Sequence, residues 1–406
     1  MAKSTKEIKN NTFSLLLALF SFIFLIVYLI KVDGVNEVTT VLRTAHFGWL
    51  VAAVACMLVY WLLDAIVLHI SVRMVDPSHT FRFSLRLTMI GQYFNNVTPF
   101  ASGGQPAQAF FMIRRGAPVG KTMTALLTKF IVYQITLTVY CLATLILKFS
   151  YFMSEVKVLM VAVIVGFTAH TAVTLMLVGV AFFKSATERI ALLGIRILAK
   201  IRIVKDPAAK AESVLAELEN FHEQFQIMRR HKAEILKMCL ITVVQLTVYF
   251  LIGNVIYNSF HLTGTDSLTL LASQAFVLMI ATFVPIPGAL GAADGSFAIF
   301  FSLFFPQHLI SFALVLWRLL TFYLPIVIGL FETLIEKKRA AVPRSAPLTE
   351  STIPAAPDPS SSVPDMPVRE APVHSVSAGG LALEEVREDS YPPDGRDDKN
   401  PGNENS

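Results

Sequence analysis

Long apolar runs are the feature that most constrains the fold of this chain. Each of six runs is long enough to cross about 30 Å of hydrocarbon at about 1.5 Å per helical residue. They cover residues 13–30, 47–70, 122–147, 157–183, 235–259 and 309–334. Hydrophobic residues make up 54% of the chain, and charged residues only 16%. These values exclude a soluble multidomain protein and predict an all-α polytopic membrane protein with about six spanning helices.

Two further apolar stretches are broken in the middle. Residues 83–94 and 107–113 flank one break, and residues 268–284 and 292–305 flank the other. Residues that interrupt helices occur in both breaks, namely Pro99, Pro106, Pro285, Pro287, Gly288 and Gly291. Free backbone groups cannot face lipid, so each break must be buried in protein or line a wet cavity. We therefore predict two re-entrant helical hairpins.

The distribution of Lys and Arg supports this topology. If both hairpins return to the side that they leave, 23 of these residues fall on one side of the membrane and 4 on the other. Cytoplasmic loops carry the excess of positive charge in membrane proteins. We therefore expect a bacterial plasma-membrane protein with both termini in the cytoplasm.

The order of the predicted elements repeats. Two helices, a hairpin and a further helix occur up to about residue 150 and again from about residue 157. Three crossings in each half invert the second copy, and many transporters place a central site between such inverted repeats. The predicted domains are a membrane domain over 1–340, with a cytoplasmic loop at 184–235, and a tail over 341–406. The tail holds 11 of the 20 prolines and 12 acidic residues, which predicts disorder.

One segment of the cytoplasmic loop is amphipathic. Asp206 and Pro207 are typical of a helix start. An apolar stripe follows at helical spacing, formed by Val214, Leu218, Phe221, Phe225 and Met228. This stripe lies either on the inner leaflet, beside basic residues at 229–232, or against the helix bundle. We favour the leaflet.

Five charged residues fall inside the predicted hydrocarbon region. Such charges are costly and usually face a cavity or a partner. Asp64 and Glu332 lie near the inner ends of their helices, where headgroup contact explains them as well as function does. Lys129, Asp294 and Arg318 are predicted to set the charge of a cavity or to gate movement. The structural alternative is an Asp294–Arg318 ion pair that holds the second hairpin in place.

The first break is a candidate binding site for an anionic lipid headgroup. Backbone N–H groups at a helix start attract phosphate, because the positive end of the helix dipole lies there. Nearby amide side chains are expected to bind glycerol or sugar hydroxyls. The backbone groups are those of Ser102, Gly103, Gly104 and Gln105, and the amides are those of Asn95, Asn96 and Gln108. The alternative is a tight turn in which glycine permits close packing.

The sequence shows few features of an enzyme. It has no nucleophile elbow, P-loop, metal-ligand cluster or acidic pair, so we expect no metal and no cofactor. Segment 184–237 carries 11 basic residues and seven acidic ones, which the positive-inside pattern explains without a nucleic-acid partner. The expected partner is a membrane lipid, and a separate lipid synthase is a second candidate.

Two ordered motifs surround the breaks. The first runs from Asn95 to Pro106 and continues with Arg114-Arg115-Gly116 and the segment 129–134. The second covers 285–295 and is followed by Trp317-Arg318. Together they resemble the lysylphosphatidylglycerol synthase transmembrane family, also called the flippase-like domain family, over residues 12–339. The resemblance implies a fold similar to the membrane half of the multiple peptide resistance factor, which attaches lysine to phosphatidylglycerol and moves the product to the outer leaflet.

Three kinds of function are considered. We expect translocation of a phospholipid, an aminoacyl-phospholipid or a glycolipid. In the multiple peptide resistance factor, the resemblance assigns lysyl transfer to a separate soluble domain that follows the membrane region. In this chain, a short tail follows the membrane region. The alternatives are a phosphatidylglycerol lysyltransferase and a membrane partner of a separate lipid synthase.

The chain departs from many relatives at three positions. Gln108 stands where many carry Arg, Asp294 where many carry Glu, and Lys129 where many carry Glu. A Lys in place of a Glu is expected to favour a more anionic lipid.

Overall fold

The computed structural model describes residues 19, 23, 46–200, 206–282 and 284–341. Within these residues the chain forms α-helices with short 3₁₀ and π segments, and it contains no strand. The predicted all-α class is therefore confirmed. The first apolar run, 13–30, and the tail, 341–406, lie outside the described residues except for positions 19, 23 and 341.

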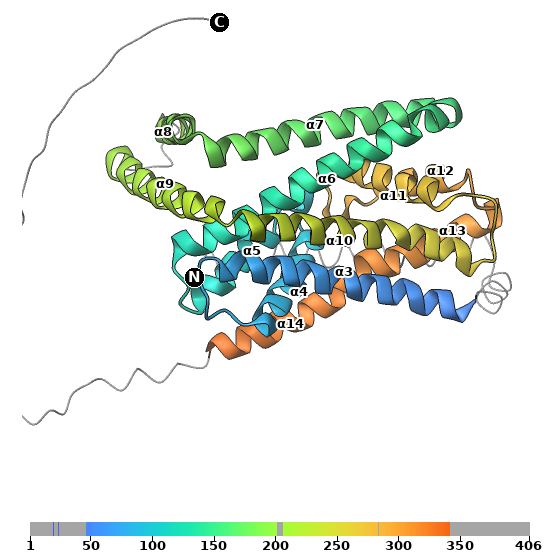
Figure 1. The fold of residues 1–406 in the computed structure, drawn as a ribbon, viewed down its shortest axis with the longest axis horizontal. Helices are drawn as coiled ribbons and strands as arrows, with labels where there is room; N and C mark the ends of the chain where they lie inside the picture. The colour runs from blue at the N-terminus through green and yellow to red at the C-terminus, as the bar shows by residue number, and fades with distance from the viewer. Residues whose placement is uncertain (1–18, 20–22, 24–45, 201–205, 283, 342–406) are drawn as a thin grey trace, which may run out of the picture. The chain divides into compact units, whose positions relative to one another are not determined.

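Five helices are long and apolar enough to cross a membrane, and they run across the view in Figure 1. They agree with the five predicted crossings that follow the first apolar run. Four are continuous, namely α3 (Phe47–Arg73), α6 (Val119–Glu155), α7 (Lys157–Phe182) and α10 (Lys232–Ser259). The fifth comprises α13 (Gln307–Arg318), a π-helical turn η3 (Leu319–Tyr323) and α14 (Leu324–Ala341). The turn precedes Pro325, which lacks the N–H that a regular helix needs there.

Both broken stretches form helical hairpins. The first comprises α4 (Phe81–Val97), a 3₁₀ turn η1 (Pro99–Ala101) and α5 (Gly104–Arg114). The second comprises α11 (Ser267–Ala281), a 3₁₀ turn η2 (Pro287–Ala289) and α12 (Ala292–Phe301). In each hairpin the two helices pack against one another.

Contacts at the open ends show that each hairpin returns to the end of the bundle that it leaves. In the first hairpin, the guanidinium of Arg115 lies 3.9 Å from the centre of the Phe83 ring. In the second, Lys148 Nζ of α6 is 3.1 Å from Asp266 Oδ1 at the start of α11. The ring of Tyr151, one turn further along α6, stacks on Phe304 just after α12, with centroids 6.5 Å apart. The hairpins enter from opposite ends of the bundle.

The two hairpin turns share one backbone conformation. Phe100 has φ 55° and ψ 21°, and Gly288 has φ 63° and ψ 13°, each directly after a proline. The next residue, Ala101 or Ala289, also has positive φ. The turns contact each other, and the preceding helices α3 and α10 pack side by side with His46 N donating to Ser259 O at 2.9 Å. These matched features agree with the predicted inverted repeat.

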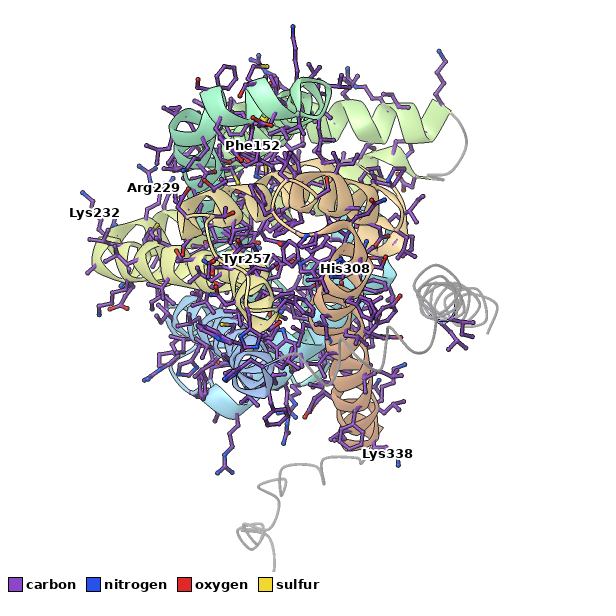
Figure 2. All side chains as sticks on the ribbon, turned by 90° about the vertical axis from the view of Figure 1, so that its right-hand side faces the viewer. Phe152, Arg229, Lys232, Tyr257, His308 and Lys338 are labelled. Atoms are coloured by element: carbon purple, nitrogen blue, oxygen red, sulfur yellow. The ribbon has the colours of Figure 1, made fainter. Side chains whose placement is uncertain are left out.

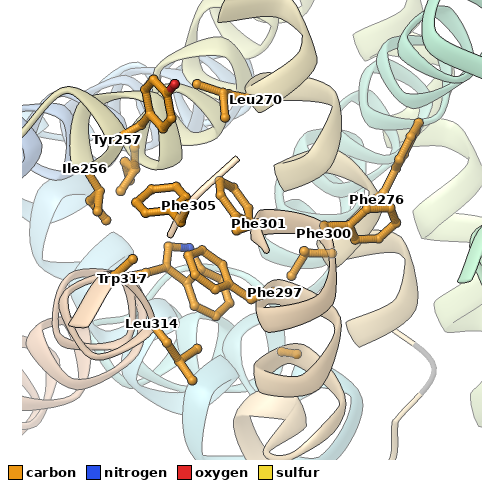
Figure 3. Close-up of a cluster of buried hydrophobic side chains, with 14 of the residues drawn as sticks. Ile256, Tyr257, Leu270, Phe276, Phe297, Phe300, Phe301, Phe305, Leu314 and Trp317 are labelled. Atoms are coloured by element: carbon orange, nitrogen blue, oxygen red, sulfur yellow. The ribbon is translucent and has the colours of Figure 1, made fainter. Parts of the chain in front are cut away.

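An aromatic cluster fixes the second hairpin between α10 and α13 (Figure 3). The Phe297 ring stacks on Phe301 at 4.2 Å and on Trp317 at 4.8 Å. Phe305 meets Tyr257 of α10 edge to face at 5.4 Å. Aromatic pairs of this kind add about 0.5–1.5 kcal/mol beyond the area that they bury. The hairpin is therefore anchored at its helices, while its turn faces the centre of the molecule.

Basic residues gather at one end of the bundle. The end where α6 passes into α7 faces the viewer in Figure 2, together with Tyr257 and His308. The described Lys and Arg residues at this end are Lys148 and Lys157. The opposite end holds many more, including Arg73, Arg115, Lys184, Arg229, Lys232 and Lys338. The segregation matches the one expected from the sequence.

We favoured a position on the inner leaflet for the apolar stripe of the cytoplasmic loop, and this prediction was wrong. The stripe lies on α9 (Pro207–Arg230), which begins at Asp206 as predicted, with Asp206 Oδ1 accepting from Ala208 N at 3.1 Å. Phe225 is 6% exposed and Met228 is fully buried. Phe225 packs with Ile131 of α6 and Ala181 of α7. Since the bundle supplies an apolar surface at this position, α9 packs on protein.

The close contact of α4 with α14 depends on a glycine. A Cβ on Gly329 would overlap the carbonyl oxygen of Met89 and the Cβ of Tyr93. We expect Gly329→Ala to destabilise the folded protein by about 1–3 kcal/mol, because overpacking displaces backbone. The matched control is Gly295→Ala in α12, where an added Cβ meets nothing within 4 Å. Thermal unfolding in detergent should show a lower midpoint for Gly329→Ala alone, and equal midpoints would contradict the packing.

Candidate functional site

A cavity of about 880 Å³ lies between the two hairpins and the surrounding long helices. Its walls come from both halves of the chain, since α3, α6, α7, α10 and the π turn all contribute. Of the residues selected from the sequence, those that line it are Asn95, Asn96, Ser102, Gly104, Gln105, Pro106, Gln108, Lys129, Gly288 and Arg318. Residues more than 200 positions apart in the sequence therefore share one chamber.

Six of the selected residues do not line the cavity. Five shape the hairpin turns, namely Pro99, Gly103, Pro285, Pro287 and Gly291. The sixth, Asp294, acts on the cavity through Arg318. The second turn needs glycine at position 288, because φ is 63° there and a Cβ would overlap the ring of Phe322.

A buried ion pair forms one wall of the cavity. Lys129 Nζ of α6 lies 2.8 Å from Asp64 Oδ1 of α3, and the two side chains are 7% and 9% exposed. Gln245 Nε2 of α10 donates to the same oxygen at 3.3 Å. Asp64 is therefore a buried partner and does not reach the headgroups. Lys129 is therefore a paired cation, and the expected preference for a more anionic lipid stays a prediction.

A second ion pair links the end of α13 to the second hairpin. Arg318 Nε donates to Asp294 Oδ1, and Arg318 Nη1 donates to Gly288 O at 3.0 Å. Asp294 Oδ2 accepts from Gly291 N at 2.8 Å, which caps α12. The ion pair considered as the structural alternative is thus present. It leaves Arg318 Nη2 buried without a hydrogen-bond partner among the described residues, and Arg318 is only 3% exposed.

The expected anion site at the start of α5 is already filled by side chains of the first hairpin. Gly103 N donates to Thr98 Oγ1 at 2.8 Å, and Gly104 N donates to Asn95 Oδ1 at 2.9 Å. A Cβ on Gly104 would overlap the Asn95 amide. In this conformation the two glycine N–H groups stabilise the turn and are not available to a phosphate, so the tight-turn alternative describes this segment better.

Residues that line the cavity contain buried polar atoms that lack a hydrogen-bond partner among the described residues. They are Thr88 Oγ1, Gln105 Oε1, Gln108 Oε1, His170 Nε2, Gln274 Oε1, Trp317 Nε1 and Arg318 Nη2. Leaving such a group unsatisfied costs about 1–3 kcal/mol. An occupant rich in hydroxyl and phosphate groups would satisfy donors and acceptors together. Part of the chamber lining is therefore polar and not fully satisfied within the described residues.

Sequence reasoning missed three of these residues. None of His170, Thr88 and Gln274 was selected from the sequence. Each is buried, with exposures of 2%, 0% and 1%. A polar side chain inside an apolar segment is itself a signal, because hydrocarbon disfavours it unless it meets a partner or a cavity. Gln274 lies within the apolar stretch 268–284 and could have been found in this way.

The same cavity has an apolar side that reaches the surface. Phe100, Met123 and Ile286 line it and are 58%, 44% and 41% exposed. Large apolar side chains on the outside of a membrane bundle face the acyl chains of lipid. The cavity lining therefore combines polar residues with exposed apolar ones.

Two ion pairs tie the first hairpin to α14 at the cation-rich end. Arg115 forms a bidentate ion pair with the buried Glu336. Its Nε donates to Oε1 at 2.6 Å, and its Nη2 donates to Oε2 at 2.7 Å. Arg86 Nε lies 3.7 Å from Glu332 Oε2. Glu332 therefore has a protein partner on the first hairpin.

Comparison with known proteins places this architecture in a family. The family described as the lysylphosphatidylglycerol synthase TM region matches residues 12–329. The chain belongs to this family. It is also 27% identical over 312 residues to a protein named UPF0104 membrane protein from Archaeoglobus fulgidus, over 72% of this chain and 88% of that protein. Family membership and the five apolar helices establish a multi-pass membrane protein.

A double-mutant cycle tests the Asp64–Lys129 pair. Asp64→Asn and Lys129→Gln should each destabilise the protein by about 3–5 kcal/mol, because each leaves one buried charge unpaired. The double variant should lose less than the sum, since no buried charge remains. Lys148→Gln is the control, because its pair with the 58%-exposed Asp266 is worth less than about 1 kcal/mol. Strictly additive losses in reversible detergent unfolding would contradict the pair.

Proposed function

We propose that this protein moves a phospholipid or glycolipid between the two leaflets of the plasma membrane. The observation that carries the proposal is the chamber between the two hairpins, with buried, unsatisfied polar atoms on its wall and exposed apolar residues at its side. A headgroup in this chamber would hydrogen-bond to the amides, while its acyl chains stay in the hydrocarbon.

The charges around the chamber favour one class of headgroup. Its two cations, Lys129 and Arg318, are each paired with a carboxylate, so the charged side chains are balanced. Arg318 Nη2 offers one donor suited to a phosphodiester oxygen. A lysyl group would need a carboxylate, and both Asp64 and Asp294 already have a cation. A headgroup that combines an uncharged polyol with one phosphate or one sugar thus fits better than a lysylated headgroup. Aminoacyl-phospholipids are the second choice.

The repeat suggests how the headgroup crosses. The hairpins enter from opposite ends and meet at their turns, so tilting one hairpin away from the other opens the chamber to one side at a time. We place the cation-rich end and both chain termini in the cytoplasm. A separate lipid synthase would supply the lipid on that side.

Fluorescent lipids in proteoliposomes test this proposal. Protein reconstituted with NBD-labelled phosphatidylglycerol or a glycosyldiacylglycerol should expose inner-leaflet lipid to dithionite, whereas empty liposomes should not. Gln274→Leu should slow this exposure about tenfold, since the loss of one buried hydrogen bond to the headgroup is worth about 1–3 kcal/mol. Gln307→Leu, at the exposed start of α13, should behave as wild type.

Two outcomes would contradict the proposal: no exposure above empty liposomes for any headgroup, or full activity in Gln274→Leu. A bulky residue at Gly104 is a poor test, because it would break the hydrogen bond from Gly104 to Asn95 and disturb the turn itself. A new aminoacylated lipid in extracts of cells expressing this chain alone would instead support lysyl transfer.

A further inference from the structure

Helix α8 (Lys184–Lys200) lies across the direction of the long helices. It is seen nearly end-on in Figure 1, where the long helices run across the picture, and it runs across the picture in Figure 2 after the 90° turn. It directly follows the end of α7, which is long enough to span the membrane. Its axis therefore lies in the plane of the membrane, at the cation-rich surface.

The corner between α7 and α8 is held by specific contacts. Thr187 Oγ1 donates to Val180 O at 3.0 Å and to Phe183 O at 3.1 Å, which satisfies carbonyl groups at the end of α7. Lys184 Nζ donates to Glu219 Oε1 of α9 at 2.8 Å. Thr187 and Ile195 are buried. These contacts fix which face of α8 meets protein and which faces outward.

The outward face carries an apolar stripe. Ile190, Leu193 and Ile197 follow one another at steps of three and four residues, so their side chains share one face of the helix. They are 64%, 56% and 54% exposed. By contrast, Phe225 and Met228 near the end of α9 are buried against the bundle.

A row of cations borders the stripe. Arg189, Arg196 and Lys200 are spaced by seven and four residues, which places them along one edge of the same exposed surface. All three are exposed, and none has an acidic partner among the described residues. An apolar stripe with a basic edge, on a helix that lies in the membrane plane, matches a lipid surface with anionic headgroups.

We propose that α8 is a binding surface for anionic phospholipids of the leaflet at the cation-rich end. Ile190, Leu193 and Ile197 insert among the upper acyl chains, while Arg189, Arg196 and Lys200 bind headgroup phosphates. This surface is separate from the cavity between the hairpins, and the proposal does not depend on lipid translocation.

Position-specific fluorescence tests the proposal in the full-length protein. After replacement of the three native cysteines by Ala, an NBD label is attached at Leu193→Cys on the stripe. The control label is attached at Ser213→Cys, an exposed position on α9. Both proteins are reconstituted in vesicles with equal amounts of phosphatidylcholine and phosphatidylglycerol, with bromine on the chains of one lipid or the other.

We expect blue-shifted emission and strong bromine quenching for the label at 193, and water-like emission without quenching at 213. Brominated phosphatidylglycerol should quench the label at 193 at least twofold more than brominated phosphatidylcholine. The variant Arg189→Gln/Arg196→Gln/Lys200→Gln should lose that preference and keep the blue shift. High salt should reduce the preference, since it screens exposed charges.

Three results would overturn the proposal. Water-like emission at 193 would show that the stripe is not in lipid. A blue shift that neither brominated lipid quenches would show that protein covers the stripe, either another part of this chain or a second copy. Equal quenching by the two lipids in the wild-type background would show that the basic edge does not select anionic lipid.

Discussion

The structure depends on satisfying backbone groups in the middle of a bilayer. Hydrocarbon offers no hydrogen bonds, so a helix can break at membrane depth only where protein or a wet cavity takes up the freed groups. The two hairpin turns meet this requirement by local bonding and by contact with each other. Thr98 and Asn95 bind the N–H groups of the first turn, and Asp294 binds the N–H of Gly291 in the second. The chamber forms where these two turns meet, each with backbone N–H groups bonded within its own hairpin.

The buried charges follow from the same requirement. Each of the two described cations in the membrane interior has its carboxylate on a different element, so Lys129 joins α6 to α3, and Arg318 joins α13 to the second hairpin. Such pairs add little net stability, but breaking one is costly, so they fix the relative positions of elements. Arg318 Nη2 remains buried without a hydrogen-bond partner among the described residues.

Much of the fold was predictable, because Pro and Gly inside apolar runs have few interpretations in a membrane. The hairpins and five crossings follow from Pro99, Pro287 and the lengths of the runs. The site was less predictable. The Asp64–Lys129 pair joins residues 65 positions apart, and no local pattern encodes that contact. The glycine turn had two interpretations, and only the position of the Asn95 side chain distinguishes them.

The amphipathic segments show a further limit of sequence reasoning. The stripe on α9 has helical spacing and basic neighbours, but periodicity alone does not distinguish a lipid surface from a protein surface. Phe225 is buried because α6 and α7 lie beside it, and this neighbourhood depends on the tertiary fold. In α8, Ile190 and Leu193 remain exposed because the corner at Thr187 turns them away from the bundle.

We propose that the two hairpin turns must separate for a headgroup to cross. Reversible crosslinking tests this requirement, through cysteines introduced at Phe100 and Ala289 in a background without native cysteines and a short thiol-cleavable crosslinker. Lipid movement is then followed by albumin extraction of a short-chain fluorescent lipid, which leaves the crosslink intact. We expect crosslinked protein to stop moving lipid and reduction to restore movement. Undiminished movement in fully crosslinked protein would contradict the proposed separation of the turns.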